Sequence, residues 1–237
     1  MRKRDTIVAV VVGLSVVVLA GCSSSSTATS TTATAAGPQA LVGTFRLTAG
    51  TSTASGATGT YFRMIQPNGT LASGPFFDNP DSTATDKSYT LQAPGTAGGL
   101  VTDRFQPNPS PAFDASGNAL AGAIVAPTPF SAIAFGISTD ATDPQTGKSV
   151  PAPSISFENG KITGQLESWT ASWNKLYFNQ GSPKPDGTSP GLTSPVSGTY
   201  DSATHAFVIT WASEIVGGPF NGFTGYWHLQ GTFAPGN

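Results

Sequence analysis

Residues 223–233 read Phe-Thr-Gly-Tyr-Trp-His-Leu-Gln-Gly-Thr-Phe and alternate large apolar side chains with polar ones. Phe223, Trp227, Leu229 and Phe233 occupy odd positions, whereas the even positions hold Thr, Tyr, His and Gln. Because successive side chains of a strand point to opposite faces, this pattern predicts a β-strand with one face in the core and the other in water. His228 is therefore expected on the solvent side, where its replacement by alanine would cost less than ~0.5 kcal/mol.

The segment just before this strand has the same alternation. Phe207, Ile209 and Trp211 share one face of residues 205–213, and Asp201-Ser-Ala-Thr204 precedes them as a tight turn. The loop at residues 217–222 contains Asn-Gly, which is a strong turn signal between two strands. The two segments are predicted to pair as antiparallel neighbours.

The rest of the chain after residue 38 also favours strands, because Gly or Pro interrupts nearly every window of ten residues and no amphipathic helix is visible. The predicted fold is all-β: an antiparallel β-sandwich or barrel-like single domain over residues 39–237. Pro-rich segments 106–113 and 180–195 are expected to be surface loops. The remaining strands are expected at residues 41–48, 60–66, 88–92, 100–105, 120–126, 131–138, 161–173, 176–179 and 198–201.

A short motif, Gly-Thr followed by Phe or Tyr, occurs four times in the chain, beginning at Gly43, Gly59, Gly198 and Gly231. The spacing between the copies is unequal, which disfavours an internal duplication. The motif is interpreted as one way of entering a strand that the chain uses repeatedly.

The N-terminus predicts export. Basic residues 2–4 precede a 14-residue apolar stretch at residues 7–20, which is shorter than the ~20 residues that a membrane-spanning helix needs. Leu19-Ala20-Gly21-Cys22 resembles the lipobox of bacterial lipoproteins. That resemblance implies a signal peptide at residues 1–21, cleavage before Cys22, acylation of the Cys22 thiol and attachment to membrane lipid at the outer face of the cell membrane.

Residues 22–38 contain mostly Ser, Thr, Ala and Gly after the cysteine and are predicted to be a flexible linker. The chain has a formal charge of −2 and only 10% charged residues. It therefore offers no basic stripe for phosphates, and nucleic acid is not an expected partner.

The C-terminal block Gly-Gly-Pro-Phe-Asn-Gly-Phe-Thr-Gly-Tyr-Trp-His-Leu, residues 217–229, resembles a signature of uncharacterised exported β-rich bacterial proteins. With its lipobox and its Ser, Thr, Ala, Gly and Pro content, the whole chain resembles actinobacterial lipoproteins. The resemblance supports fold and location and implies no activity.

Aromatic residues suggest a ligand site. If residues 161–173 form one strand, Trp169 and Trp173 share a face with Glu167, and Tyr177 follows closely. Aromatic rings beside polar groups suit a glycan or a lipid-like ligand, although both Trp side chains could instead lie in the core. A non-enzymatic, membrane-tethered binding domain is the leading functional hypothesis.

Two alternatives stay open, an envelope glycan hydrolase and a purely structural envelope protein. Glu214 and His228, on the two predicted neighbouring strands, are candidate catalytic residues, while Glu158 and Glu167 could form a glycosidase pair. No nucleophile elbow of the form Gly-x-Ser-x-Gly is present.

No metal or cofactor is expected. Two histidines are too few for an ordinary zinc site, and residues 78–81 with Asp86 lack the closing Glu of a calcium loop. Residues 143–149 end like a phosphate-binding loop, but Thr142 stands where the first Gly is required, so a turn is predicted.

Overall fold

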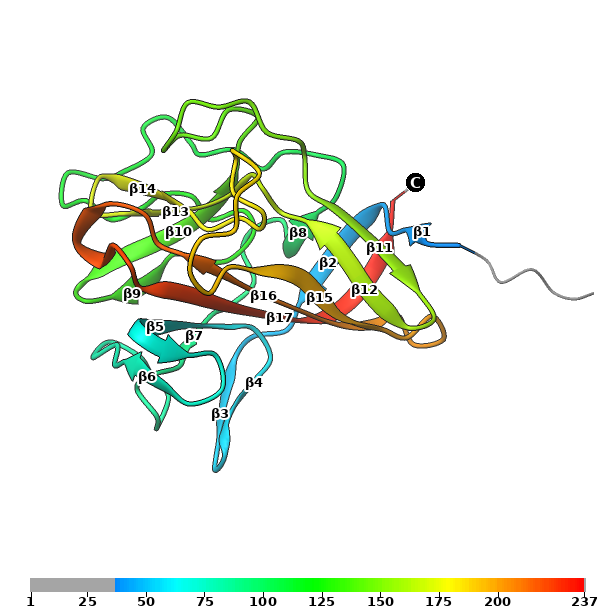
Figure 1. Cartoon of the computed structure of the whole chain (residues 1–237), viewed down its shortest axis with the longest axis horizontal. Helices are drawn as coiled ribbons and strands as arrows, with labels where there is room; N and C mark the ends of the chain where they lie inside the picture. The colour runs from blue at the N-terminus through cyan, green and yellow to red at the C-terminus, as the bar shows by residue number, and fades with distance from the viewer. Residues whose placement is uncertain (1–36, 237) are drawn as a thin grey trace, which may run out of the picture. The chain divides into compact units, whose positions relative to one another are not determined.

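A computed structural model describes residues 37–236 (Figure 1). This part of the chain is all-β and antiparallel, as predicted, with one sheet that curls like half of a barrel. Its single helical element is a 3-10 turn, η1 (Gly218–Phe220). The predicted signal peptide, Cys22 and nearly all of the linker lie outside the described residues.

The larger sheet has eight strands along its main path, in the order β1-β11-β12-β15-β16-β17-β2-β8. Their bounds are β1 (Gln39–Ala40), β11 (Ser154–Glu158), β12 (Lys161–Gln165), β15 (Ser194–Tyr200), β16 (Ala206–Glu214), β17 (Thr224–Pro235), β2 (Gly43–Leu47) and β8 (Gly99–Val101). The long strand β17 also pairs with β5 (Tyr61–Thr70), which carries β6 (Gly74–Phe77) and β7 (Thr90–Leu91). One strand thus joins two parts of the sheet.

The pairing of β16 with β17 confirms the predicted antiparallel neighbours, with Trp211 opposite Trp227. Trp211, Trp227 and Leu229 are almost fully buried, so the predicted inward face is correct. Phe223 is only partly buried, because it lies just before β17 and packs at the edge of the core.

A smaller sheet has the order β14-β13-β10-β9, with β14 (Leu176–Asn179), β13 (Trp169–Trp173), β10 (Ile133–Thr139) and β9 (Thr128–Phe130). The single strand predicted at residues 161–173 is therefore wrong. The chain turns after Gln165, so that β12 belongs to the larger sheet and β13 to the smaller one. Leu166 is fully buried in this turn.

Other strand predictions differ in detail. Residues 120–126 form no strand and make only an isolated bridge between Val125 and Pro94. Six strands were not predicted, namely β1, β6, β9, β11 and the separate hairpin of β3 (Thr51–Thr53) and β4 (Gly56–Thr58). Most of these are short or have mixed exposure, so they carry little alternation for a sequence reading to detect.

The segment 180–195 is not simply a surface loop. Its first residues are buried because their backbone oxygens accept hydrogen bonds from β16: Trp211 Nε1 donates to the carbonyl of Gln180 at 2.8 Å, and Ser213 Oγ donates to that of Gly181 at 2.7 Å. Lys184 is also buried. The loop is exposed at residues 186–189 and again at Gly191 and Pro195.

The repeated Gly-Thr motif has a structural explanation. A Cβ atom at Gly43, Gly59, Gly198 or Gly231 would lie 2.3, 2.2, 1.9 or 1.8 Å from a backbone carbonyl oxygen of another segment. These distances are far shorter than any non-bonded contact. The motif marks the places where two backbones approach more closely than a side chain allows.

Candidate ligand-binding site

The predicted aromatic site does not form as expected. Trp169 has no exposed surface and stacks edge-on against Trp211 and Trp227, at centroid distances of 5.1 and 5.5 Å. It lies in the core and offers no surface to a ligand. The turn after Gln165 explains this, because it separates Trp169 from the strand whose outer face it was expected to share.

The other three predicted ligand residues lie in different places. Tyr177 packs against Phe113 at 5.3 Å, whereas its neighbour Phe178 points to the other side of β14. Glu167 lies in the turn before β13, where partial burial raises the pKa of its carboxyl. Only Trp173 of the predicted group lines a hollow.

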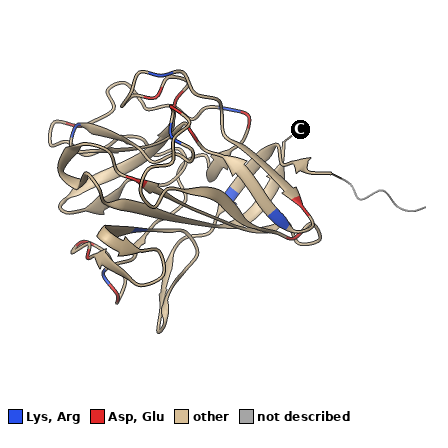
Figure 2. Cartoon of the chain, in the orientation of Figure 1, with Lys and Arg blue, Asp and Glu red and all other residues tan. Residues whose placement is uncertain are grey.

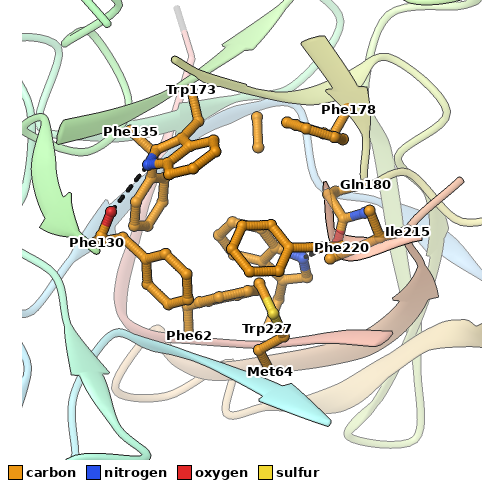
Figure 3. A pocket seen from close by; sticks show the side chains of 11 residues that line it. Phe62, Met64, Phe130, Phe135, Trp173, Phe178, Gln180, Ile215, Phe220 and Trp227 are labelled. Carbon is orange, nitrogen blue, oxygen red and sulfur yellow. Dashed lines mark hydrogen bonds between the residues drawn. The ribbon is translucent and has the colours of Figure 1, made fainter. Parts of the chain in front are cut away.

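That hollow lies between the two sheets and has a volume of about 410 Å³, including its opening to solvent (Figure 3). The larger sheet contributes Phe62, Met64 and Trp227, and the smaller sheet with its β9 edge contributes the opposite wall. The full lining is Phe62, Met64, Phe130, Phe135, Ala171, Trp173, Phe178, Gln180, Ile215, Phe220 and Trp227. Ten of these eleven side chains are apolar or aromatic.

The polar atoms of the lining are occupied by one another or by the backbone. Trp173 Nε1 donates to the carbonyl oxygen of Phe130 at 2.9 Å, which is drawn as a dashed line in Figure 3. Trp227 Nε1 lies 3.4 Å from Gln180 Oε1, and Gln180 Nε2 donates to the carbonyl of Asn179 at 3.2 Å. Both indole rings are thereby fixed in orientation, and they present apolar surface to the hollow.

Phe220 covers part of the hollow from the short turn η1. Its ring lies 5.4 Å from that of Trp173 and 5.8 Å from that of Phe130. No residue of η1 is buried, and both Gly217 and Gly218 have positive φ angles, of 78° and 64°. The cover is thus a single aromatic side chain on an exposed turn that only glycines can form without strain.

The candidate catalytic residues Glu214 and His228 are on neighbouring strands, as predicted, but they do not meet. Glu214 is opposite Thr224 and His228 is opposite Thr210, so that four positions separate them along the ladder. At about 3.3 Å per residue this is about 13 Å, too far for a carboxylate to orient an imidazole.

His228 also differs from its predicted solvent-exposed state. Its ring stacks on Tyr61 with a centroid distance of 4.5 Å and an interplanar angle of 4°, and Nδ1 lies 2.8 Å from the carbonyl oxygen of Gly59. Burial lowers the pKa of His228 and raises that of Tyr61 to about 12. The ring of Tyr61, on the neighbouring strand β5, and the backbone of Gly59 therefore shield His228 from water on this face of the sheet.

Charged side chains are few and lie mostly in loops and at strand ends (Figure 2). None of them lines the hollow. Over residues 37–236, no group of three or more His, Cys, Asp or Glu side chains could hold a metal ion. In the same residues no helix has the length and apolar character needed to cross a bilayer.

Comparisons with protein-family models, with curated proteins and with solved structures find no match to this chain. The residues that form the hollow come from six strands, one turn and two loops spread from Phe62 to Trp227. The sequence signal nearest to the site is the C-terminal block at residues 217–229, which contains the covering residue Phe220.

Proposed function

We propose that this chain is an exported, lipid-anchored protein that binds a small apolar ligand in the hollow between its two sheets, without catalysing a reaction. The observation that carries the proposal is the lining of that hollow, in which seven aromatic side chains surround one amide side chain. Ligand pockets in proteins are typically concave and mostly apolar, with a few placed polar groups.

The lining favours one class of ligand over the other class that the sequence suggested. A glycan carries many hydroxyl groups, each of which loses hydrogen bonds to water when buried, and only Gln180 could replace them here. A single aromatic ring or a short alkyl chain loses nothing of this kind and gains contact with the rings of Phe62, Phe135 and Trp173. The lipid-like alternative is therefore the better supported one.

Filling the hollow is expected to abolish binding. Ala171 lines it from β13 and is the smallest side chain there, so Ala171→Phe would place a ring in the ligand's space. We expect the affinity for probe molecules such as toluene, indole and 1-octanol to fall at least about tenfold, which corresponds to 1.4 kcal/mol. The affinity is measured by titrating the full-length chain in detergent with each probe. Binding is detected by the fluorescence of Trp173 and Trp227, and for indole by calorimetry.

Leu120→Phe is the matched control, because it adds the same ring at a side chain that is 45% exposed and does not line the hollow. It should bind the probes as the wild type does. Soluble chito- and malto-oligosaccharides should give no saturable change. Absence of saturable binding by every apolar probe, or equal binding by the Ala171→Phe variant, would contradict the proposal.

The lipid anchor is supported by the sequence around Cys22. The chain's only cysteine follows Leu19-Ala20-Gly21, and 16 residues separate it from the first strand, which begins at Gln39. At full extension this linker reaches about 55 Å, enough to hold the β-domain clear of a membrane surface. Two or three acyl chains anchor a protein far more firmly than a single one.

Cys22→Ala is expected to release the protein from the membrane, since no other side chain can form the thioether. Expressed in a bacterial host that processes lipoproteins, the wild type should enter the detergent phase in a Triton X-114 partition and the variant should not. Ser23→Ala is the control and should behave as the wild type. Equal partition of the wild type and Cys22→Ala into detergent would rule out the lipid anchor.

A further inference from the structure

A second cavity lies beside the hollow and differs from it in chemistry. It has a volume of about 450 Å³ with its opening included, and seven of its ten lining residues have polar side chains, among them Gln145, Thr146, Asn179, Lys184 and Thr188. One wall is the predicted turn at residues 143–149, and another is the loop from Lys184 to Pro190.

Lys184 is the unusual member of this lining, because it is only 6% exposed. The four other lysines of the described residues, Lys87, Lys148, Lys161 and Lys175, are all exposed. The hydrogen bond that the structure shows for Lys184 Nζ goes to a neutral group, the carbonyl oxygen of Asn179, at 2.6 Å. The amine is thus buried in the wall of a cavity that opens to solvent.

Several charged groups face this amine. Asp143 is fully buried, and Thr170 Oγ1 and Asn179 Nδ2 donate hydrogen bonds to its carboxylate at 3.1 and 3.0 Å. Two further carboxylates attract the ammonium group electrostatically: Glu214 on β16 and Asp186 in the loop that carries Lys184. These three carboxylates raise the pKa of Lys184, but loss of water around the ammonium group outweighs them and brings it to about 8. About a tenth of Lys184 is therefore neutral, and nucleophilic, at pH 7 and about a quarter at pH 7.5, far more than of a lysine with an ordinary pKa.

We propose that Lys184 is a carbonyl-reactive residue, which forms a reversible imine with small polar aldehydes that enter this cavity. The amine nitrogen adds to the aldehyde carbon to give a carbinolamine, which then loses water to leave a carbon–nitrogen double bond. The amine supplies both hydrogens of that water and the aldehyde supplies its oxygen, so that no oxidant or reductant takes part.

The surroundings suit this chemistry. Loss of the carbinolamine hydroxyl needs a proton, and the cavity's opening to solvent lets water supply and recover it. Hydroxyl and amide groups of Thr146, Gln145 and Thr188 line the rest of the cavity and match a hydroxylated aldehyde, such as the open form of a short sugar.

The test compares the lysines of one folded protein. The full-length chain in detergent is incubated at pH 7.5 with glyceraldehyde and a limiting amount of cyanoborohydride, which reduces each imine to a stable amine, and peptide mass mapping locates the products. We expect Lys184 to be modified about tenfold faster than Lys87, Lys148, Lys161 or Lys175, because more of it is neutral at this pH. The α-amino group is scored as a separate peptide.

Three comparisons test the result, and the first two use the unchanged protein, so they do not depend on a variant that could fail to fold. In urea the preference for Lys184 should disappear, since all lysines then have ordinary pKa values. In the folded protein the rate at Lys184 should reach half of its maximum near pH 8 and level off above pH 9, while the rates at the exposed lysines continue to rise. Lys175→Arg, at an exposed lysine that does not line the cavity, should leave the modification of Lys184 unchanged, and Lys184→Met should remove it.

Modification of the exposed lysines at the same rate as Lys184 or faster, in the folded chain, would overturn the proposal. So would a preference for Lys184 that survives in urea. Either outcome would leave Lys184 as a structural residue that holds the 180–195 loop through the carbonyl of Asn179.

Discussion

Replacing Trp227 with alanine is expected to lower the free energy of unfolding by about 4 kcal/mol, because it removes one of the largest fully buried side chains. Its indole ring contacts Phe62 at 4.6 Å and stacks with Trp211 at 5.9 Å. It also lies where the two sheets meet, so neighbouring side chains from both sheets would lose contacts at once. A small domain is stable by only about 5–15 kcal/mol, so this loss is a large share.

Urea unfolding of the full-length chain, followed by circular dichroism, measures the change. His228→Ala is the matched control on the same strand. The structure gives His228 a stacking contact and a hydrogen bond, so we expect a cost of about 1–2 kcal/mol, more than the sequence alone suggested and still well below that of Trp227→Ala. If His228→Ala proved the costlier change, the register of β17 would be incorrect.

Gly231→Ala is expected to cost about 3 kcal/mol, although it adds a single methyl group. The new Cβ would lie 1.8 Å from the carbonyl oxygen of Arg46 and 3.1 Å from the Cα atom of Leu47. Gly231 is the first residue of β17 that pairs with β2, after the strand has left β5. Because both atoms belong to backbone, no side-chain rotation relieves the clash, and the sheet must open where it changes partner.

The adjacent substitution Thr232→Ala separates this effect from general damage to the strand. Thr232 is exposed, and its replacement is expected to change stability by less than ~0.5 kcal/mol. Both variants can be compared by urea unfolding monitored through tryptophan fluorescence. A Gly231→Ala protein as stable as Thr232→Ala would show that the two strands do not approach as closely as described.

The candidate site could be predicted only in part. Period-two alternation identified the inward faces of β16 and β17 and therefore Trp227, because burial on one face leaves a direct trace in the sequence. The turn at Leu166 leaves no such trace, since an apolar residue fits equally well inside a strand. A reading of residues 161–173 as one strand consequently placed Trp169 on a ligand surface, whereas the turn carries it into the core.

The sequence by itself determined the all-β class and the pairing of the last two strands. It did so because alternation is a local property of the chain. The tertiary structure alone decided that Phe62, Phe135, Trp173 and Phe220 share one hollow and that Lys184 is buried beside it. These residues come together through pairings between distant strands, and the energy of such pairings depends on contacts that no single stretch of sequence contains.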